Sequence, residues 1–139
     1  MKLSIMLFFS GMLLAESCDT PKSNEEALYG HSWELEYISG PRIAFDALFP
    51  EKKPYLNFDK DSGKVTGSDS CNGYSADFEL SENSIVFGNP NPTTMMFCGG
   101  SERHFLEMMK KIDGYSFKGG KLNLLLGEIP MMRFKKVKL

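Results

Sequence analysis

The 139-residue chain has little of several things that mark common functional classes. It contains only two histidines, one tryptophan and three cysteines, and its formal net charge at pH 7 is −2. A nearly neutral chain without a stripe of lysine and arginine lacks the electrostatic footprint of a nucleic-acid-binding protein. The sequence also has no internal repeat and no low-complexity tract. What remains is a small globular protein that is not expected to bind nucleic acid.

The chain begins with the order of a secretory signal. Lys2 is followed by an uncharged apolar run from Leu3 to Ala15, and small or polar residues then lead to Cys18. The run is too short to span a bilayer as a helix. Its order of charged, apolar and cleavage regions is that of a signal peptide. We therefore expect the protein to be exported.

The end of this signal resembles a bacterial lipobox, in which small residues precede a cysteine that is diacylated and becomes the mature N-terminus. The segment LAESC makes Cys18 the expected lipidation site and residues 1–17 the expected lipoprotein signal peptide. Glu16 departs from the lipobox pattern, and a plain cut after Ala15, giving a soluble secreted protein, is the alternative. Residues 18–28 are polar and have little to bury, which favours a flexible tether.

The remaining residues, 29–139, are enough for one domain with one core and too few for two. Apolar and polar residues alternate in them with the period of two that is typical of strands with one buried face. Clear examples are WELEY from Trp33 to Tyr37 and YSADFEL from Tyr74 to Leu80. Polar or glycine-rich turns separate such runs. Seven or eight short strands predict a strongly curved, mostly antiparallel and barrel-like sheet.

Two segments break this alternation. Residues 101–114 carry apolar side chains at helical spacing, with Ser101 as the expected N-cap. One amphipathic helix should pack on the open side of the sheet, so the expected fold class is α+β. Residues 40–54 contain three prolines and indicate a loop with one helical turn at Ala44 to Leu48. This loop either covers the core or shapes a surface for a ligand or partner.

Several motifs, in their order and spacing, resemble the META domain, the family that includes the bacterial heat-shock protein HslJ. The family pattern has Trp-x-Leu, a Gly-Cys-Asn turn, Thr-x-Met-x-Cys, a Glu-x-x-Phe-Leu helix and a Gly-x-x-Leu-x-Leu hairpin. The matching residues here are Trp33, Leu35, Cys71, Asn72, Tyr74, Thr94, Met96, Cys98, Phe105, Leu106, Leu122 and Leu124. Ser70 departs from the pattern, because the family usually has glycine before the cysteine. The resemblance covers the chain from Trp33 to Phe134.

The resemblance bears on the two cysteines outside the lipid site. Many members of the family carry this pair, which implies that Cys71 and Cys98 are bridged, and a disulfide suits an exported domain. Asn72 and Gly73 both tolerate the left-handed conformation that a tight turn after Cys71 would need. Two free buried thiols are one alternative. The other is a functional thiol at Cys98 with His104 nearby, for which the sequence offers neither an orienting residue nor oxyanion donors.

We expect no catalytic residue, no cofactor and no metal site. Cys98 and His104 match no zinc spacing, and the acidic residues are dispersed through turns and tails. No glycine-rich phosphate loop is present in the sequence. Of the nine methionines, the pairs Met95-Met96, Met108-Met109 and Met131-Met132 are expected to fill the core, since a copper-binding methionine surface would need these pairs to converge in space.

The lipobox-like segment, the lack of a catalytic set and the family resemblance together favour a non-enzymatic lipoprotein of the bacterial envelope. It would act as a monomer, held by its lipid at the periplasmic or cell-surface side of a membrane, and serve stress tolerance by binding an envelope protein. One alternative is a carrier with an apolar cavity inside the curved sheet. Another is an inhibitor of a periplasmic enzyme, with a rigid loop such as residues 88–94 entering the cleft of its target.

Overall fold

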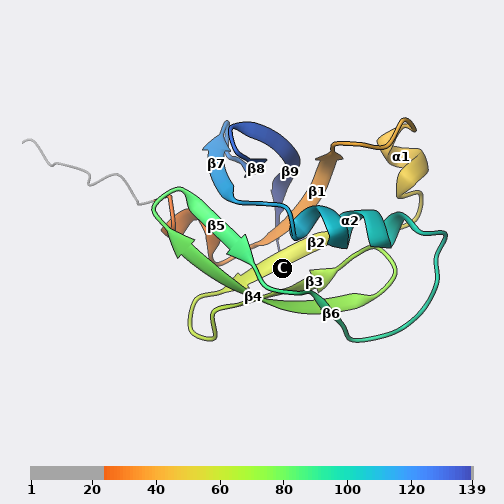
Figure 1. The fold of residues 1–139 in the computed structure, drawn as a ribbon, viewed down its shortest axis with the longest axis horizontal. Helices are drawn as coiled ribbons and strands as arrows, with labels where there is room; N and C mark the ends of the chain where they lie inside the picture. Colours follow the sequence, from red (N-terminus) through yellow and green to blue (C-terminus); the bar gives the residue numbers. More distant parts are fainter. Residues whose placement is uncertain (1–23, 139) are drawn as a thin grey trace, which may run out of the picture.

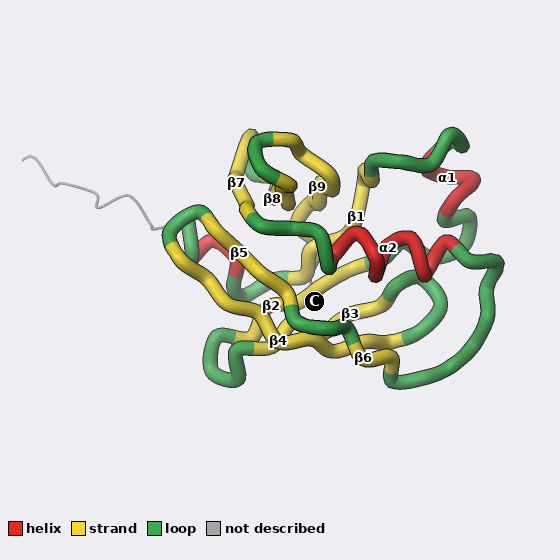
Figure 2. The backbone as a smooth tube through the Cα atoms, in the orientation of Figure 1, coloured by secondary structure: helices red, strands yellow, loops and turns green. Residues whose placement is uncertain are grey.

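The computed structural model describes residues 24–138, so the expected signal peptide and lipidated Cys18 lie outside the described residues. The elements are drawn in Figures 1 and 2. Their bounds, in chain order, are η1 (a 3-10 helix, Glu26–Leu28), β1 (Ser32–Ile38), α1 (Phe45–Leu48), β2 (Tyr55–Asp59), β3 (Lys64–Ser68), β4 (Gly73–Ser81), β5 (Ser84–Phe87), β6 (Asn91–Pro92), α2 (Ser101–Met109), β7 (Gly114–Lys118), β8 (Lys121–Leu126) and β9 (Ile129–Val137). No helix within residues 24–138 is long and apolar enough to cross a membrane.

The strands form one antiparallel sheet that closes on itself. Their order is β3-β2-β1-β9-β8-β7-β5-β4-β6, and β3 also pairs with β4, which returns the sheet to its start. Strands β5 and β7 are paired in register at one position, Ser84 opposite Gly114. The strongly curved, mostly antiparallel sheet expected from the sequence is confirmed, as is the α+β class. The strand that the alternation did not predict is β6, which has only two residues and therefore no period.

One hydrophobic core fills the inside of this ring-like sheet. The largest fully buried side chains are those of Leu28, Trp33, Leu35, Leu56, Tyr74, Ile85, Phe105, Met109, Tyr115, Leu122, Leu124 and Phe134. Helix α2 lies across the opening between β2 and β7 (Figure 1). The buried Phe105 and Met109 project from α2 into the core.

The folded part begins earlier than residue 29. Leu28, which the sequence placed in the tether, is fully buried, and its carbonyl accepts a hydrogen bond of 3.0 Å from the indole nitrogen of Trp33.

The sequence left two interpretations of residues 40–54, a loop that covers the core or one that shapes a surface for a ligand or partner. The structure supports the first. Phe49 is 2% exposed within the core, and Phe45 and Leu48 pack against it, so this loop covers the core.

Candidate functional site

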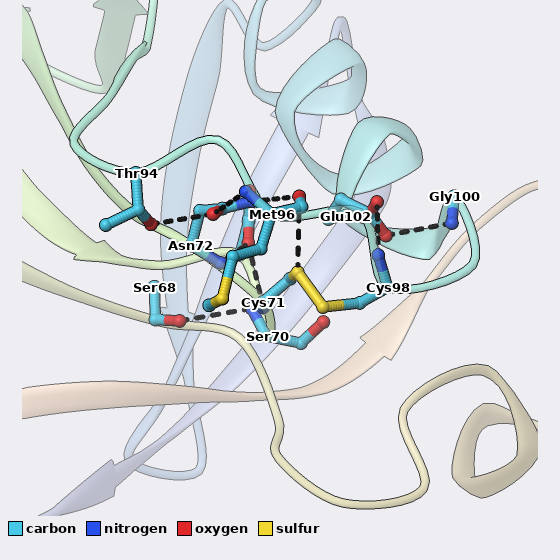
Figure 3. Close-up of a disulfide and its surroundings, with 10 residues drawn as sticks. Ser68, Ser70, Cys71, Asn72, Thr94, Met96, Cys98, Gly100 and Glu102 are labelled. Carbon is cyan, nitrogen blue, oxygen red and sulfur yellow. Dashed lines mark hydrogen bonds between the residues drawn. A yellow bond between two sulfur atoms is a disulfide. The ribbon is translucent and has the colours of Figure 1, made fainter.

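The candidate site is built on the disulfide loop, which we define as residues 93–100, between β6 and α2. Cys98 in this loop is bonded to Cys71, which follows β3, with Cα atoms 5.8 Å apart (Figure 3). The disulfide that the resemblance implied is therefore present, and Cys98 has no free thiol. His104 does not face Cys98 as a base would, since its Nε2 lies 3.0 Å from the carbonyl oxygen of Ser39.

Asn72 fixes the backbone of the disulfide loop. Its Oδ1 accepts hydrogen bonds from the Thr94 hydroxyl (2.6 Å) and the Met96 N–H (2.8 Å). Its Nδ2 donates to the carbonyl oxygen of Met96 at 2.8 Å (Figure 3). Asn72 is 5% exposed, so these bonds replace water at a buried amide and hold Met96 on both sides of its backbone. A Cβ at the adjacent Gly73 would lie 2.5 Å from the Thr93 hydroxyl oxygen, so a larger residue there needs the Thr93 side chain to move.

The turn that carries Cys71 is organised by Asp69. This carboxylate is 1% exposed, and its Oδ1 accepts the backbone N–H groups of Cys71 (2.9 Å) and Asn72 (2.6 Å). The left-handed conformation falls on Ser70, with φ +91°, and not on Asn72 or Gly73 as expected. Ser70 stands where the family usually has glycine, and a serine held at positive φ stores backbone strain. The two hydrogen bonds to Asp69 fix the turn around that strained residue.

Glu102 holds the other end of the disulfide loop. Its carboxylate accepts hydrogen bonds from the backbone N–H groups of Cys98 (3.2 Å) and Gly100 (2.9 Å). Ser101, expected as the N-cap, is the first residue of α2. The cap position belongs to Gly100, with φ +96° and no side chain to accept a bond, and Glu102 accepts in its place. Burial raises the pKa of Glu102, but hydrogen bonds from its own N–H and from Cys98 and Gly100 outweigh burial and hold this pKa below its ordinary value.

We expect Glu102→Gln to lower the free energy of unfolding at pH 7 by about 1–2 kcal/mol, because the amide group turns a donor toward one of the two N–H groups. A lowered folded-state pKa means that the carboxylate stabilises the fold above the ordinary pKa of 4.5, and that this stabilisation is lost as the pH falls through the folded value. The difference in free energy of unfolding between Glu102→Gln and wild type, measured by urea unfolding, should therefore be smaller at pH 3 than at pH 7.

The matched control is Glu107→Gln, on the exposed face of the same helix, where the carboxylate pairs with Lys110 in solvent. Exposed pairs contribute little to stability, so this variant should resemble wild type at both pH values. If the loss in free energy of unfolding caused by Glu102→Gln were the same at pH 7 and pH 3, the assigned role of the carboxylate would be contradicted.

The middle of the disulfide loop is an exposed apolar surface. Met95, Met96 and Phe97 are 91%, 60% and 79% exposed, and we call these three residues the apolar tip. The expectation that the methionines fill the core is wrong for Met95 and Met96, although it holds for Met108, Met109 and Met132. The reason is that Asn72 and the disulfide hold the backbone of the tip at the surface, where its side chains have no core to enter.

Two surface grooves flank the disulfide loop. One, of about 320 Å³, lies between the loop and α2 and is lined by Pro92, Met96, Phe97, Arg103 and Leu106 among others. The other, of about 350 Å³, is lined by Phe49, Pro50, Cys98 and Ser101 among others. The apolar tip lines the first groove through Met95, Met96 and Phe97, whereas the second groove meets the disulfide loop at Cys98. In the part of the chain that is described, no group of three or more His, Cys, Asp or Glu side chains could hold a metal ion.

A small α+β domain, with a ring-like antiparallel sheet, one helix across its opening and a disulfide-bonded loop, is the class that fold and site define. The META domain family model matches residues 26–138, which is nearly all of the described chain. The chain belongs to the META domain family. No curated protein matches it.

Solved structures share the fold. A protein from Burkholderia xenovorans, determined by NMR, is 19% identical with a TM-score of 0.61, over 97% of this chain and 100% of that one. A crystal structure of a DUF4847 family protein from Bacteroides vulgatus is 15% identical with a TM-score of 0.59, over 83% of this chain and 98% of that one. At these identities the likeness concerns the fold alone.

Proposed function

We propose that the protein is a non-enzymatic lipoprotein of the bacterial cell envelope, anchored through Cys18, whose META domain binds another envelope protein through the apolar tip. Its task, as the family resemblance implies, is tolerance of envelope stress. The observation that carries the proposal is the exposure of Met95, Met96 and Phe97 on a backbone that Asn72, Glu102 and the disulfide hold in place.

The apolar tip has the properties of a binding surface. Adjacent exposed apolar side chains are unfavourable in water, and contiguous patches of this kind mark interaction sites. A loop that is already held in shape loses less conformational entropy on binding than a free one. Methionine and phenylalanine are also enriched in the buried centres of protein interfaces. The partner that fits is a protein with an apolar groove or pocket.

The place of the tip in the fold suits a tethered protein. The first described residue, Asn24, contacts Asn83 in the turn between β4 and β5. Figure 1 shows the chain entering there, at the left, whereas the disulfide loop lies at the opposite end of the long axis. The attachment end of the described domain and the apolar tip are therefore at opposite ends, so a lipid on Cys18 would not itself cover the tip.

The filled interior argues for a binding surface over a ligand carrier. A carrier of apolar ligands needs an enclosed cavity. The inside of the ring-like sheet is occupied by side chains such as Trp33, Leu122 and Phe134, each 0% exposed. The two grooves beside the disulfide loop lie at the surface instead. The inhibitor alternative assigns the contact with its target to residues 88–94, directly before the tip, so the identity of the captured partner distinguishes that alternative.

The test is site-directed photo-crosslinking in the native cell. A photoreactive phenylalanine analogue in place of Phe97 should give one discrete adduct with an envelope protein. The matched control carries the analogue in place of Val86, which is 52% exposed on β5 and outside the disulfide loop. The Phe97 adduct should be lost in Met95→Ser/Met96→Ser. Absence of an adduct at Phe97, or the same adduct from both positions, would refute the binding role of the tip.

The intact mass of the protein, purified from the membrane fraction of the native cell, tests the anchor. The mass should correspond to a chain that starts at Cys18 and carries added acyl groups. A chain that starts at Glu16 without acyl mass would refute the anchor and leave a soluble exported protein.

A further inference from the structure

The methionines of the described chain differ widely in exposure, with the half-buried Met131 between the two extremes. Met95 and Met96, in the apolar tip, are 91% and 60% exposed. Met108, Met109 and Met132, in the core, are 5%, 0% and 0% exposed. Thioether oxidation follows exposure, so an oxidant in solution meets Met95 and Met96 first. The most accessible thioethers thus lie on the surface that we assign to partner binding.

We propose that Met95 and Met96 form a reversible oxidation site, and that their conversion to methionine sulfoxide switches off the apolar tip. The oxidant is a hydroperoxide or hypochlorous acid. With hydrogen peroxide, a sulfur lone pair attacks the peroxide oxygen, an S–O bond forms, the O–O bond breaks and water leaves. The sulfur loses two electrons and the peroxide is reduced. The effect on binding rests on the proposed function, whereas the modification itself does not.

The disulfide removes the usual competitor for such an oxidant. A cysteine thiolate would normally be oxidised along the same ladder as methionine. Within residues 24–138 both cysteines, Cys71 and Cys98, are already joined to each other. No thiol beside the apolar tip can therefore intercept the oxidant, and the thioethers of Met95 and Met96 take its place.

Oxidation would change the chemistry of the tip without changing its shape. A sulfoxide converts a flexible apolar side chain into a polar one. The backbone of Met96 stays held by Asn72 through its N–H and its carbonyl oxygen, and these bonds do not involve the thioether. Phe97 would then be the only apolar side chain left on the tip. An apolar partner groove would lose its complement while the domain remained folded.

The first experiment maps oxidation residue by residue. The full-length native protein is treated with hydrogen peroxide, digested and analysed by mass spectrometry over time. Sulfoxide at Met95 and Met96 should form at least about tenfold faster than at Met108, Met109 and Met132. In urea the rates should converge. The epimer-specific methionine sulfoxide reductases, supplied with a dithiol that is oxidised to its disulfide as the sulfoxide oxygen leaves as water, should reverse the change in the folded protein. Oxidation of Met95 and Met96 no faster than the core methionines would overturn the site.

The second experiment uses the Phe97 crosslink to measure how oxidation of Met95 and Met96 affects partner binding. Peroxide should abolish the adduct in wild type but not in Met95→Leu/Met96→Leu, which keeps the apolar bulk without an oxidisable sulfur. Met95→Gln/Met96→Gln should lack the adduct before any oxidant is added. An adduct that survives complete oxidation of both methionines would overturn the switch. Absence of the adduct in every state would refute the binding function and its switch together, while the mapped oxidation would stand.

Discussion

Replacing both cysteines, as Cys71→Ala/Cys98→Ala, should lower the free energy of unfolding by about 3–4 kcal/mol. The disulfide joins residues 27 positions apart, and its loss frees that length of chain in the unfolded state. Small domains are stable by roughly 5–15 kcal/mol, so this is a large share. Urea unfolding monitored by fluorescence measures the change, because Trp33 is the single tryptophan and is 0% exposed in the fold.

Reduction of the wild-type protein is the matched control, since it opens the same bond without changing a side chain. It should lower stability by a similar amount, whereas the reductant should leave the double variant unaffected. A loss below about 1 kcal/mol in both cases would mean that the entropic account of the cross-link fails for this loop. The hydrogen bonds of Asn72 and Glu102 would then be the main restraints on the disulfide loop.

Phe105→Ala should cost about 3–5 kcal/mol, the range for truncating a buried aromatic side chain. Phe105 is 0% exposed, and its ring lies 5.8 Å from that of Tyr74, centroid to centroid. The contact between these two rings holds α2 against β4. Removing the Phe105 ring leaves a cavity and removes this contact between the helix and the sheet. The measurement is the same urea titration.

Leu106→Ala, one residue further along the helix, is the matched control. It also introduces alanine into α2, so it separates the loss of core packing from a change in helix propensity. Leu106 is half-buried and lines the groove beside the disulfide loop, so its truncation should cost clearly less than that of Phe105. Phe105→Leu should recover much of the lost stability, because it refills part of the cavity. Equal losses for Phe105→Ala and Leu106→Ala would contradict the assigned role of α2.

Period-two alternation carried most of the information about the fold. Trp33 and Leu35 in β1, and Leu122 and Leu124 in β8, lie inside the sheet, because successive side chains of a strand point to opposite faces. Residue spacing likewise placed Phe105 and Met109 of α2 in the core. Alternation cannot report which strands pair over long distances, and so it could not predict that β1 pairs with β9, the contact that joins the two halves of the ring.

The site was less accessible to sequence reasoning. An apolar triplet such as Met95-Met96-Phe97 normally indicates burial, and its exposure depends on hydrogen bonds from Asn72, far away in the sequence. Buried carboxylates are equally hard to identify, because Asp69 and Glu102 look like ordinary surface residues until their N–H partners are placed. The Glu-x-x-Phe-Leu motif contained Glu102, which is the signal that could have identified it.

The pairing of β1 with β9 determines when the domain can fold. Ser32 lies opposite Val137, so the first strand of the domain finds this partner only in the last. Contacts between such distant residues form late, because a long loop must close before they are made. A chain that emerges from the ribosome N-terminus first therefore stays open until its final residues are free. For a protein exported as we propose, this delay would be useful, since the chain would reach the translocation machinery before its ring-like sheet could close.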